Sequence, residues 1–192
     1  MSSVVISGDT SGSVTLSAPT VAGSSTQTLV AATGTLAPLV SGTAQATTSG
    51  TFKDFTDIPS WVKRITVMLA GVSTSGTSPI IVQIGDSGGI ENTGYAGTGS
   101  SIAGTVTSTA FTTGFGIGAN STAAFIRNGF VTICFLGTNI WQASGIIGQS
   151  DQAQSQTTGG SKTLSDVLTQ VRITTVNGTD TFDAGSINIM YE

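Results

Sequence analysis

Several acidic residues of this chain could take part in acid–base catalysis. Two carboxylates on either side of a glycosidic bond are the usual catalytic groups of glycoside hydrolases. Each candidate here lies in a predicted turn or close to a glycine, where an acidic side chain commonly bonds the backbone of its own turn. We interpret these residues as turn-forming and predict that the protein is not an enzyme. The candidates are Asp86, Glu91, Asp151, Asp166, Asp180 and Asp183.

Nucleophilic and metal-binding side chains are scarce. The sequence contains no histidine and a single cysteine, Cys134. The absence of histidine removes Ser-His and Cys-His catalysis and the commonest zinc ligands. Cys134 lies in the apolar stretch FVTICFLG, so we predict that it is a small buried hydrophobic residue. We expect no cofactor and no bound metal.

Three aromatic residues are the candidates for ligand binding. Trp141, Tyr95 and Trp61 could stack on the face of a sugar ring while Asp or Asn side chains bond its hydroxyl groups. Aromatic residues of a β-domain more often belong to the core. The exposure of each side chain decides between these interpretations, since only an aromatic residue on a rim or in a groove can stack on a glycan.

The composition predicts an all-β protein. The chain has 192 residues, which is enough for one domain with a short appendage and a buried core. Only 8% of the residues are charged and 26 are glycine, whereas about 25% of residues are charged in a typical soluble domain. Solubility must therefore rest on Ser, Thr, Asn, Gln and Gly, a composition that favours short strands and turns over helices.

The charge distribution argues against two classes of partner. The net charge is −4 and the chain has six Lys and Arg residues, whereas nucleic-acid binding draws on clustered cations. No apolar run is long enough for a transmembrane helix, and the first residues lack the basic region of a secretory signal. We expect no nucleic-acid partner, no membrane insertion and synthesis in a cytoplasm.

The first part of the chain differs from the rest. Residues 1–45 contain one charged residue, Asp9, and the first aromatic residue of the sequence is Phe52. The strand-like pieces before residue 46 are too short to form a core of their own. We predict an extended N-terminal attachment segment at 1–45, followed by a jelly-roll-like antiparallel β-sandwich at 46–192.

Apolar alternation and turn residues place strands in the second region. The run at 130–136 lacks alternation, which predicts a strand buried on both faces. The polar stretch SDQAQSQTTGGSK at 150–162 predicts a loop. Near the end of the chain, Asn177-Gly178 predicts a tight hairpin turn, with the strand that follows it inside the sheet. The other predicted strands are 62–72, 80–84, 140–148, 168–176 and 182–191.

Three segments carry a family resemblance. They are SGDTSGSVTLSAPTVAGSSTQTLVAATGTL at 7–36, IPSWVKRITVMLAGVSTSGTSPIIVQIGDSGGIENTGY at 58–95 and FDAGSINIMYE at 182–192. Together they cover about half of the chain, and in this order they resemble small bacteriophage virion proteins of the tail-fibre or head-fibre type. The chain lacks the repeated shaft and the coiled coil of long tail fibres, so attachment to the head and to the tail both stay open.

The resemblance implies a virion structural protein that forms a homotrimer. Residues 1–45 would then attach the subunit to other virion proteins of the capsid or tail, and the β-sandwich would be a knob for host adhesion. A host-surface glycan is a further expected partner, and the virion is the expected location. A capsid decoration or cement protein and a carbohydrate-binding module are the alternative interpretations.

Overall fold

The computed structural model describes residues 3–7, 11, 13–17, 37–123 and 125–192. The chain divides into two compact units, Met1–Leu36 and Ala37–Glu192. In the first unit, β1 (Ser3–Ser7) and β2 (Ser13–Ser17) pair as an antiparallel hairpin. Most of the remaining predicted attachment segment, residues 18–36, lies outside the described residues. Residues 37–45, also predicted to belong to that segment, are part of the second unit.

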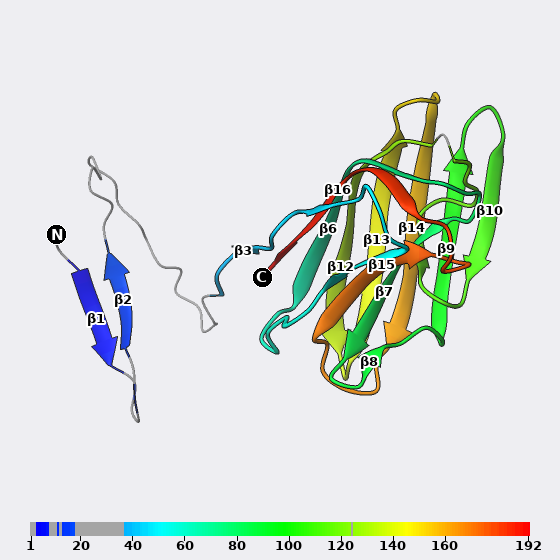
Figure 1. Ribbon diagram of the computed structural model, residues 1–192. Helices are drawn as coiled ribbons and strands as arrows, with labels where there is room; N and C mark the ends of the chain where they lie inside the picture. Colours follow the sequence, from blue (N-terminus) through cyan, green and yellow to red (C-terminus); the bar gives the residue numbers. More distant parts are fainter. Residues whose placement is uncertain (1–2, 8–10, 12, 18–36, 124) are drawn as a thin grey trace. The chain divides into compact units, whose positions relative to one another are not determined.

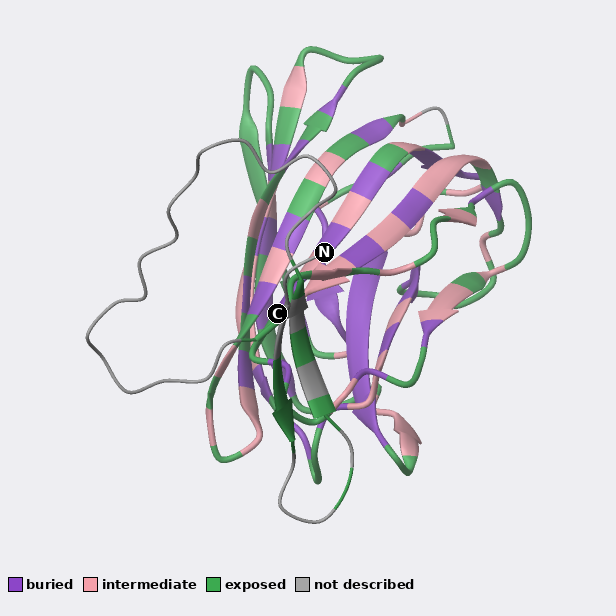
Figure 2. Ribbon diagram, turned by 90° about the vertical axis from the view of Figure 1, so that its left-hand side faces the viewer, coloured by how far each residue is buried: buried purple, intermediate pink, exposed green. Residues whose placement is uncertain are grey.

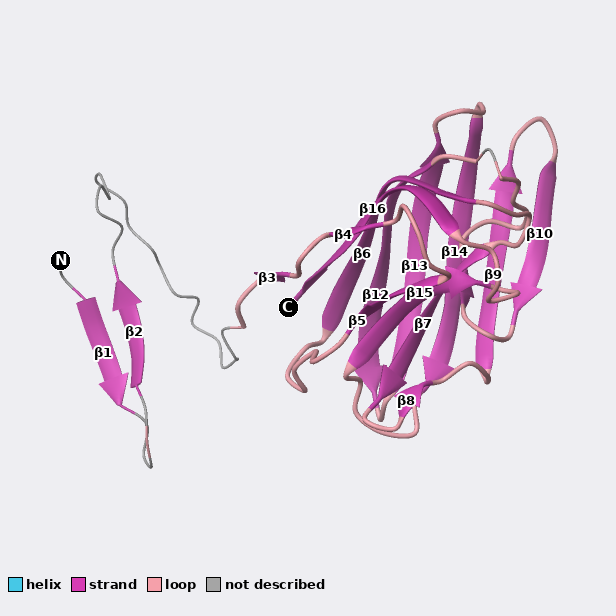
Figure 3. Ribbon diagram, in the orientation of Figure 1, coloured by secondary structure: helices cyan, strands magenta, loops and turns pink. Residues whose placement is uncertain are grey.

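The second unit is an antiparallel β-sandwich, as the composition predicts. Its sheets have nine and five strands, which we call the large sheet and the small sheet (Figure 1). The described residues contain no helix (Figure 3), and therefore none that could cross a membrane. The large sheet has the order β10 (Val106–Phe111), β9 (Tyr95–Ile102), β14 (Gln154–Thr163), β13 (Ile140–Gln149), β12 (Arg127–Gly137), β6 (Arg64–Thr74), β16 (Phe182–Tyr191) and β3 (Val40–Ser41), with β4 (Gln45–Ala46) also paired to β16.

The small sheet covers one side of the large sheet. Its order is β11 (Phe115–Gly116), β7 (Ile80–Asp86), β15 (Gln170–Thr175) and β5 (Phe52–Phe55), with β8 (Gly89–Ile90) paired to β7. Inward residues of both sheets form one hydrophobic core, because every second side chain of a strand points to the same face. Buried and exposed residues accordingly alternate along the strands in Figure 2. Core residues include Ile65, Val67, Ile80, Val82, Val131, Ile133, Val171, Ile173, Ile187 and Ile189.

The prediction that 130–136 is buried on both faces is wrong. In β12, Val131 and Ile133 are fully buried, whereas Phe130 and Leu136 are 55% and 65% exposed. Cys134 is exposed as well, so its predicted burial is also wrong. The small sheet covers only one face of β12. The apolar residues on the other face are therefore left at the surface.

The predicted hairpin at the end of the chain is wrong, although its turn is present. β15 belongs to the small sheet and β16 to the large sheet, so the chain crosses from one layer to the other between them. Asn177 Oδ1 accepts hydrogen bonds from the backbone N of Thr179 (3.0 Å) and Asp180 (3.2 Å). Gly178 follows with a φ of 68°, a conformation that glycine adopts without strain.

The prediction that the closing strand is internal to its sheet is confirmed. β16 pairs with β6 on one side and with β3 and β4 on the other. Gly185, predicted to mark a bulge, lies at a shift in the register of β16 against β6 and has a φ of 90°. The inward side chains of Ile187 and Ile189 are buried in the core.

The predicted loop at 150–162 is largely a strand, β14. Its inward positions are polar: Gln156, Thr158 and Lys162 are all buried. A segment from the 112–126 region packs closely on this inner face. A Cβ atom on Gly99 of the adjacent β9 would lie 2.6 Å from the carbonyl oxygen of Gly118, so a larger residue there would push the segment away.

Arg127 fixes the same segment to the large sheet. Its side chain is fully buried and donates from Nε to Gln156 Oε1 (3.1 Å) and from an Nη atom to Ser121 Oγ (2.6 Å). Burial lowers the pKa of Arg127 to about 10, so the guanidinium is still charged at neutral pH. A buried cation needs such hydrogen bonds, which makes this contact specific as well as stabilising.

Two truncations test where the folded domain begins. A chain of residues 37–192 keeps β3 and β4 on β16 and should unfold at the temperature of the full-length protein. A chain of residues 48–192 loses the bonds from Gly42 N to Ile189 O (2.8 Å) and from Thr47 N to Gly185 O (2.9 Å). At about 0.5–1.5 kcal/mol for each lost bond, its free energy of unfolding should be measurably lower in urea titrations. Equal stability of the two truncated chains would contradict this assignment.

Candidate functional site

Two of the three predicted sugar-stacking residues belong to the core. Trp141 and Tyr95 are each 3% exposed. Tyr95 Oη accepts a hydrogen bond from Ile84 N (2.8 Å) and donates one to Glu91 O (2.9 Å), and burial raises the pKa of this phenol. Neither ring can stack on a ligand from solvent, so both residues are structural.

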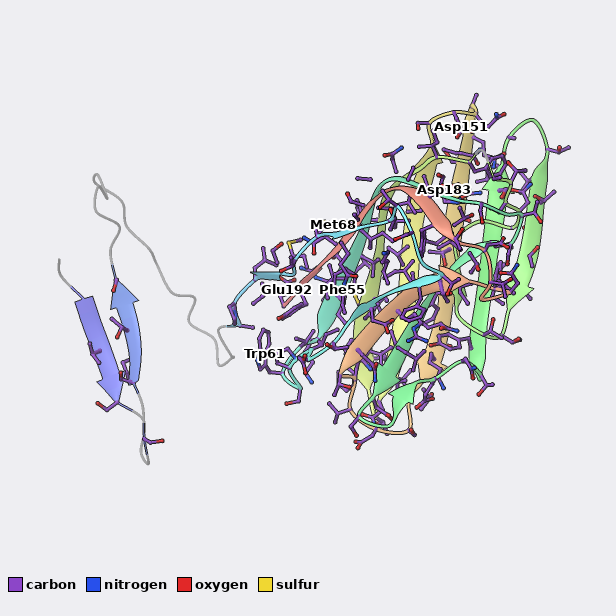
Figure 4. The ribbon with its side chains drawn as sticks, viewed as in Figure 1. Phe55, Trp61, Met68, Asp151, Asp183 and Glu192 are labelled. Carbon is purple, nitrogen blue, oxygen red and sulfur yellow. The ribbon has the colours of Figure 1, made fainter. Side chains whose placement is uncertain are left out.

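Trp61 is the predicted candidate that reaches the surface. Its side chain, which is labelled in Figure 4, is 38% exposed. It lies beside Tyr191, with 6.0 Å between the ring centroids. Trp141 contacts Phe135 and Tyr95 contacts Phe115 instead. The three predicted residues therefore do not form one site.

Two of the predicted carboxylates come together at Ser165. Its hydroxyl lies 2.6 Å from Asp86 Oδ2 and 2.7 Å from Glu91 Oε1, and Ser165 N donates to Glu91 as well. Glu91 also pairs with the buried ammonium of Lys162. Asp166 follows Ser165 directly, and a hydrogen bond from its backbone helps to lower the pKa of Asp86. The other three candidates, Asp151, Asp180 and Asp183, lie elsewhere on the domain, and Asp151 and Asp183 are labelled in Figure 4. The pairing of Asp86 and Glu91 joins β7, the β8–β9 connection and the segment before β15.

The electrostatics of this pair differ from those of a catalytic acid and base. The Ser165 hydroxyl and Gly88 N lower the pKa of Asp86. Burial raises the pKa of Glu91, but hydrogen bonds from Lys162 and Ser165 outweigh it and leave that pKa lowered too. A glycoside hydrolase needs one carboxyl whose pKa is raised so that it carries a proton at neutral pH. Both groups here are held ionised, which suits a structural network.

The outer face of the large sheet, turned away from the small sheet, is the most extended candidate surface. Residues that are opposite one another in the strand registers form rows across this sheet. Two such rows contain no charged residue. The first is Asn188, Met68, Phe130, Ile146, Thr157, Ser100 and Ser108, and the second is Met190, Thr66, Thr132, Ser144, Gly159, Thr98 and Ala110.

Apolar side chains stand out of the first row. Phe130 and Ile146 are direct cross-strand partners and are 55% and 68% exposed. A third row lies next to the second one and contains Arg64 and Cys134, which are opposite one another in the strand register. The guanidinium of Arg64 forms an ion pair with Glu192. This surface is therefore nearly neutral and apolar at its centre, which suits contact with another protein surface.

Comparisons with protein-family models, with curated proteins and with solved structures find no match to the chain. Within the described residues there is also no group of three or more His, Cys, Asp or Glu side chains that could hold a metal ion.

Sequence reasoning missed the outer face because it interpreted the run at 130–136 as doubly buried. When apolar residues point to both faces of a strand, there are two explanations. Either both faces are covered within the domain, or one face is covered and the other binds another molecule. The composition already shows that charged residues are scarce. That these charged residues lie outside the two rows depends on the strand registers, which only the structure provides.

The Asp86–Glu91 network predicts a dependence of stability on pH. Both carboxyls have pKa values below their ordinary values of 3.8 and 4.5. Their contribution to the free energy of unfolding is therefore complete above about pH 5 and is lost as the pH falls through the folded pKa values. Stability measured in urea should fall below that pH, and the fall should be smaller in a variant with Asp86→Asn and Glu91→Gln.

The control for this experiment is Asp57→Asn at an exposed position between β5 and β6. Asp57 has a φ of 59°, which Asn adopts as readily as Asp. The control should follow the pH dependence of the unchanged protein. Identical acid profiles in all three proteins would contradict a stabilising role for the network.

Proposed function

We propose that the chain is a non-enzymatic structural subunit of a bacteriophage virion, a fibre-type or appendage protein whose copies associate through the outer face of the large sheet. The observation that carries the proposal is the pair of uncharged rows across that face, with Phe130 and Ile146 exposed at its centre. The assignment to a virion rests on the resemblance of the three sequence segments to bacteriophage fibre proteins. Head or tail attachment is to be decided by labelling the C-terminus on purified particles.

Charge distribution supports a second copy of the chain as the partner for this face. The protein carries a net charge of −4, so two copies repel one another wherever their acidic surfaces meet. The two rows carry no charge that would oppose such a contact, and the nearby Arg64 is already paired with Glu192. Burying Phe130 and Ile146 between copies would contribute about 25 cal/mol for each square ångström of apolar surface removed from water.

The N-terminal unit supports the attachment part of the proposal. The domain that begins at Ala37 has its own core, and Met1–Leu36 is a compact unit in its own right. Removing residues 1–36 should therefore leave the sandwich folded while preventing its incorporation into particles. A capsid decoration or cement protein would share this plan, and the position of the label on the particle separates it from a fibre.

Oligomeric state tests the association directly. The full-length protein should sediment as a homotrimer at micromolar concentration. Phe130→Asp and Ile146→Asp, each of which places an acidic group in the neutral row, should shift it to monomer. The monomer should stay folded by circular dichroism, because both side chains are exposed in the single chain, although it loses the stability that association adds.

Val167→Asp is the matched control, since Val167 is 42% exposed and lies outside the rows. It should leave the trimer intact. A wild-type protein that sediments as a monomer, or a trimer that survives both Phe130→Asp and Ile146→Asp, would contradict association through this face.

A further inference from the structure

A hollow of about 340 Å³ lies over the outer face of the small sheet. Its floor comes from neighbouring strands, with Phe52 on β5, Arg172 and Thr174 on β15, and Gln83 on β7. Connecting segments border this floor. They contribute Asn92, Thr113, Val176, Asn177 and Gly178, and Ile90 of β8 lies at the same border.

The floor of the hollow is rigid because its side chains hold one another. Arg172 donates from Nε and Nη2 to the two carboxylate oxygens of Asp54, at 2.7 and 2.6 Å. The guanidinium carbon of Arg172 also lies 4.1 Å from the centroid of the Phe52 ring. The bidentate pair and the stacked ring fix one orientation for the guanidinium. A ligand would therefore meet a preformed surface and would not have to order it.

The charges of the hollow are already balanced. The hydrogen bonds that Arg172 donates to Asp54, together with the negative charge of that carboxylate, raise the pKa of Arg172, so the guanidinium stays charged at neutral pH. Arg172 is the only Lys or Arg among the residues that line the hollow. An anionic ligand would have to compete with the Asp54 carboxylate for this cation, which disfavours acidic ligands.

The remaining groups match a neutral polyhydroxyl ligand. Phe52 is 47% exposed, so part of its apolar ring is open to a ligand. Gln83 Nε2 donates to Thr113 O (2.8 Å), and this contact leaves the amide oxygen as an acceptor beside the guanidinium. Asn92 adds an exposed amide at the rim. Fixed donors and acceptors next to an exposed ring are what a sugar requires, since each sugar ring has an apolar C–H face and hydroxyls at its edge.

We propose that this hollow on the small sheet binds a neutral saccharide, with Phe52 packing against the sugar ring and Arg172, Gln83 and Asn92 bonding its hydroxyls. The site uses none of the three aromatic residues that the sequence singles out. It faces away from the outer face of the large sheet, so ligand can bind whether or not copies of the chain associate. The inference is independent of the proposed self-association.

The test is a titration of the full-length protein with free oligosaccharides, followed by amide chemical shifts. The probes are lactose, cellobiose, maltotriose and chitobiose, with sialyllactose and a galacturonic acid dimer as acidic counterparts. At least one neutral probe should shift amides around the hollow at millimolar concentration and should bind more tightly than either acidic probe. Phe52→Ala and Asn92→Ala should each weaken that binding by about tenfold or more.

Two controls separate the site from general surface effects. Trp61→Ala removes an exposed aromatic ring elsewhere on the domain and should leave saccharide binding unchanged. Phe52→Tyr keeps an aromatic ring in the hollow and should therefore retain saccharide binding. Circular dichroism verifies that each variant is folded. The inference is wrong if no neutral probe shifts the hollow, if Phe52→Ala binds as the unchanged protein does, or if the acidic probes bind best.

Discussion

The two-residue alternation of side chains along each strand is the constraint on which the rest of this structure depends. The central strands of the large sheet, such as β6, β12 and β13, place alternate residues in the core, and the small sheet can cover only one face of the large sheet. The side chains at the other alternate positions point to the outer face, where they must contact either water or another molecule. In this protein those positions hold Thr, Ser, Gly and Gln together with exposed apolar residues such as Phe130 and Ile146.

The two sheets use their outer faces differently. The large sheet presents rows without charge, whose neutral side chains permit a second acidic copy to approach. The small sheet presents the Asp54–Arg172 ion pair and Phe52 in a hollow. Ionisable groups are few in this chain, and several are engaged in specific contacts: Arg127 with Gln156, Lys162 with Glu91, and Arg172 with Asp54. Low charge leaves the large outer face suited to self-association, while the paired charges fix local geometry.

The sequence predicts the class of fold well because alternation and composition are local properties. The all-β sandwich and the internal closing strand are confirmed, and the strands predicted at 80–84 and 140–148 lie within β7 and β13. The division of β15 and β16 between two sheets was missed because a turn at Asn177-Gly178 fits both a hairpin and a crossing between layers. β14 was missed because its inward positions carry Gln, Thr and Lys, which pack against the glycine-rich β9 and the 112–126 region instead of an apolar core.

The candidate sites were less predictable than the fold. Asp54 and Arg172 are separated by 118 residues and meet only because β5 and β15 are neighbours, a pairing that no local pattern indicates. Trp141 and Tyr95 illustrate the converse, since aromatic residues in strands are more often core residues than ligand contacts. Exposure decided their role, and exposure depends on which layer covers each strand.

The single cysteine provides the most direct measurement of association through the outer face. Cys134 is exposed in the isolated chain and lies on that face beside the two uncharged rows. The rate at which a bulky thiol reagent modifies Cys134 should be high in dilute protein and should fall steeply as the concentration rises into the range where copies associate. A rate that stays the same at every concentration, in a protein shown by sedimentation to be oligomeric, would contradict association through this face.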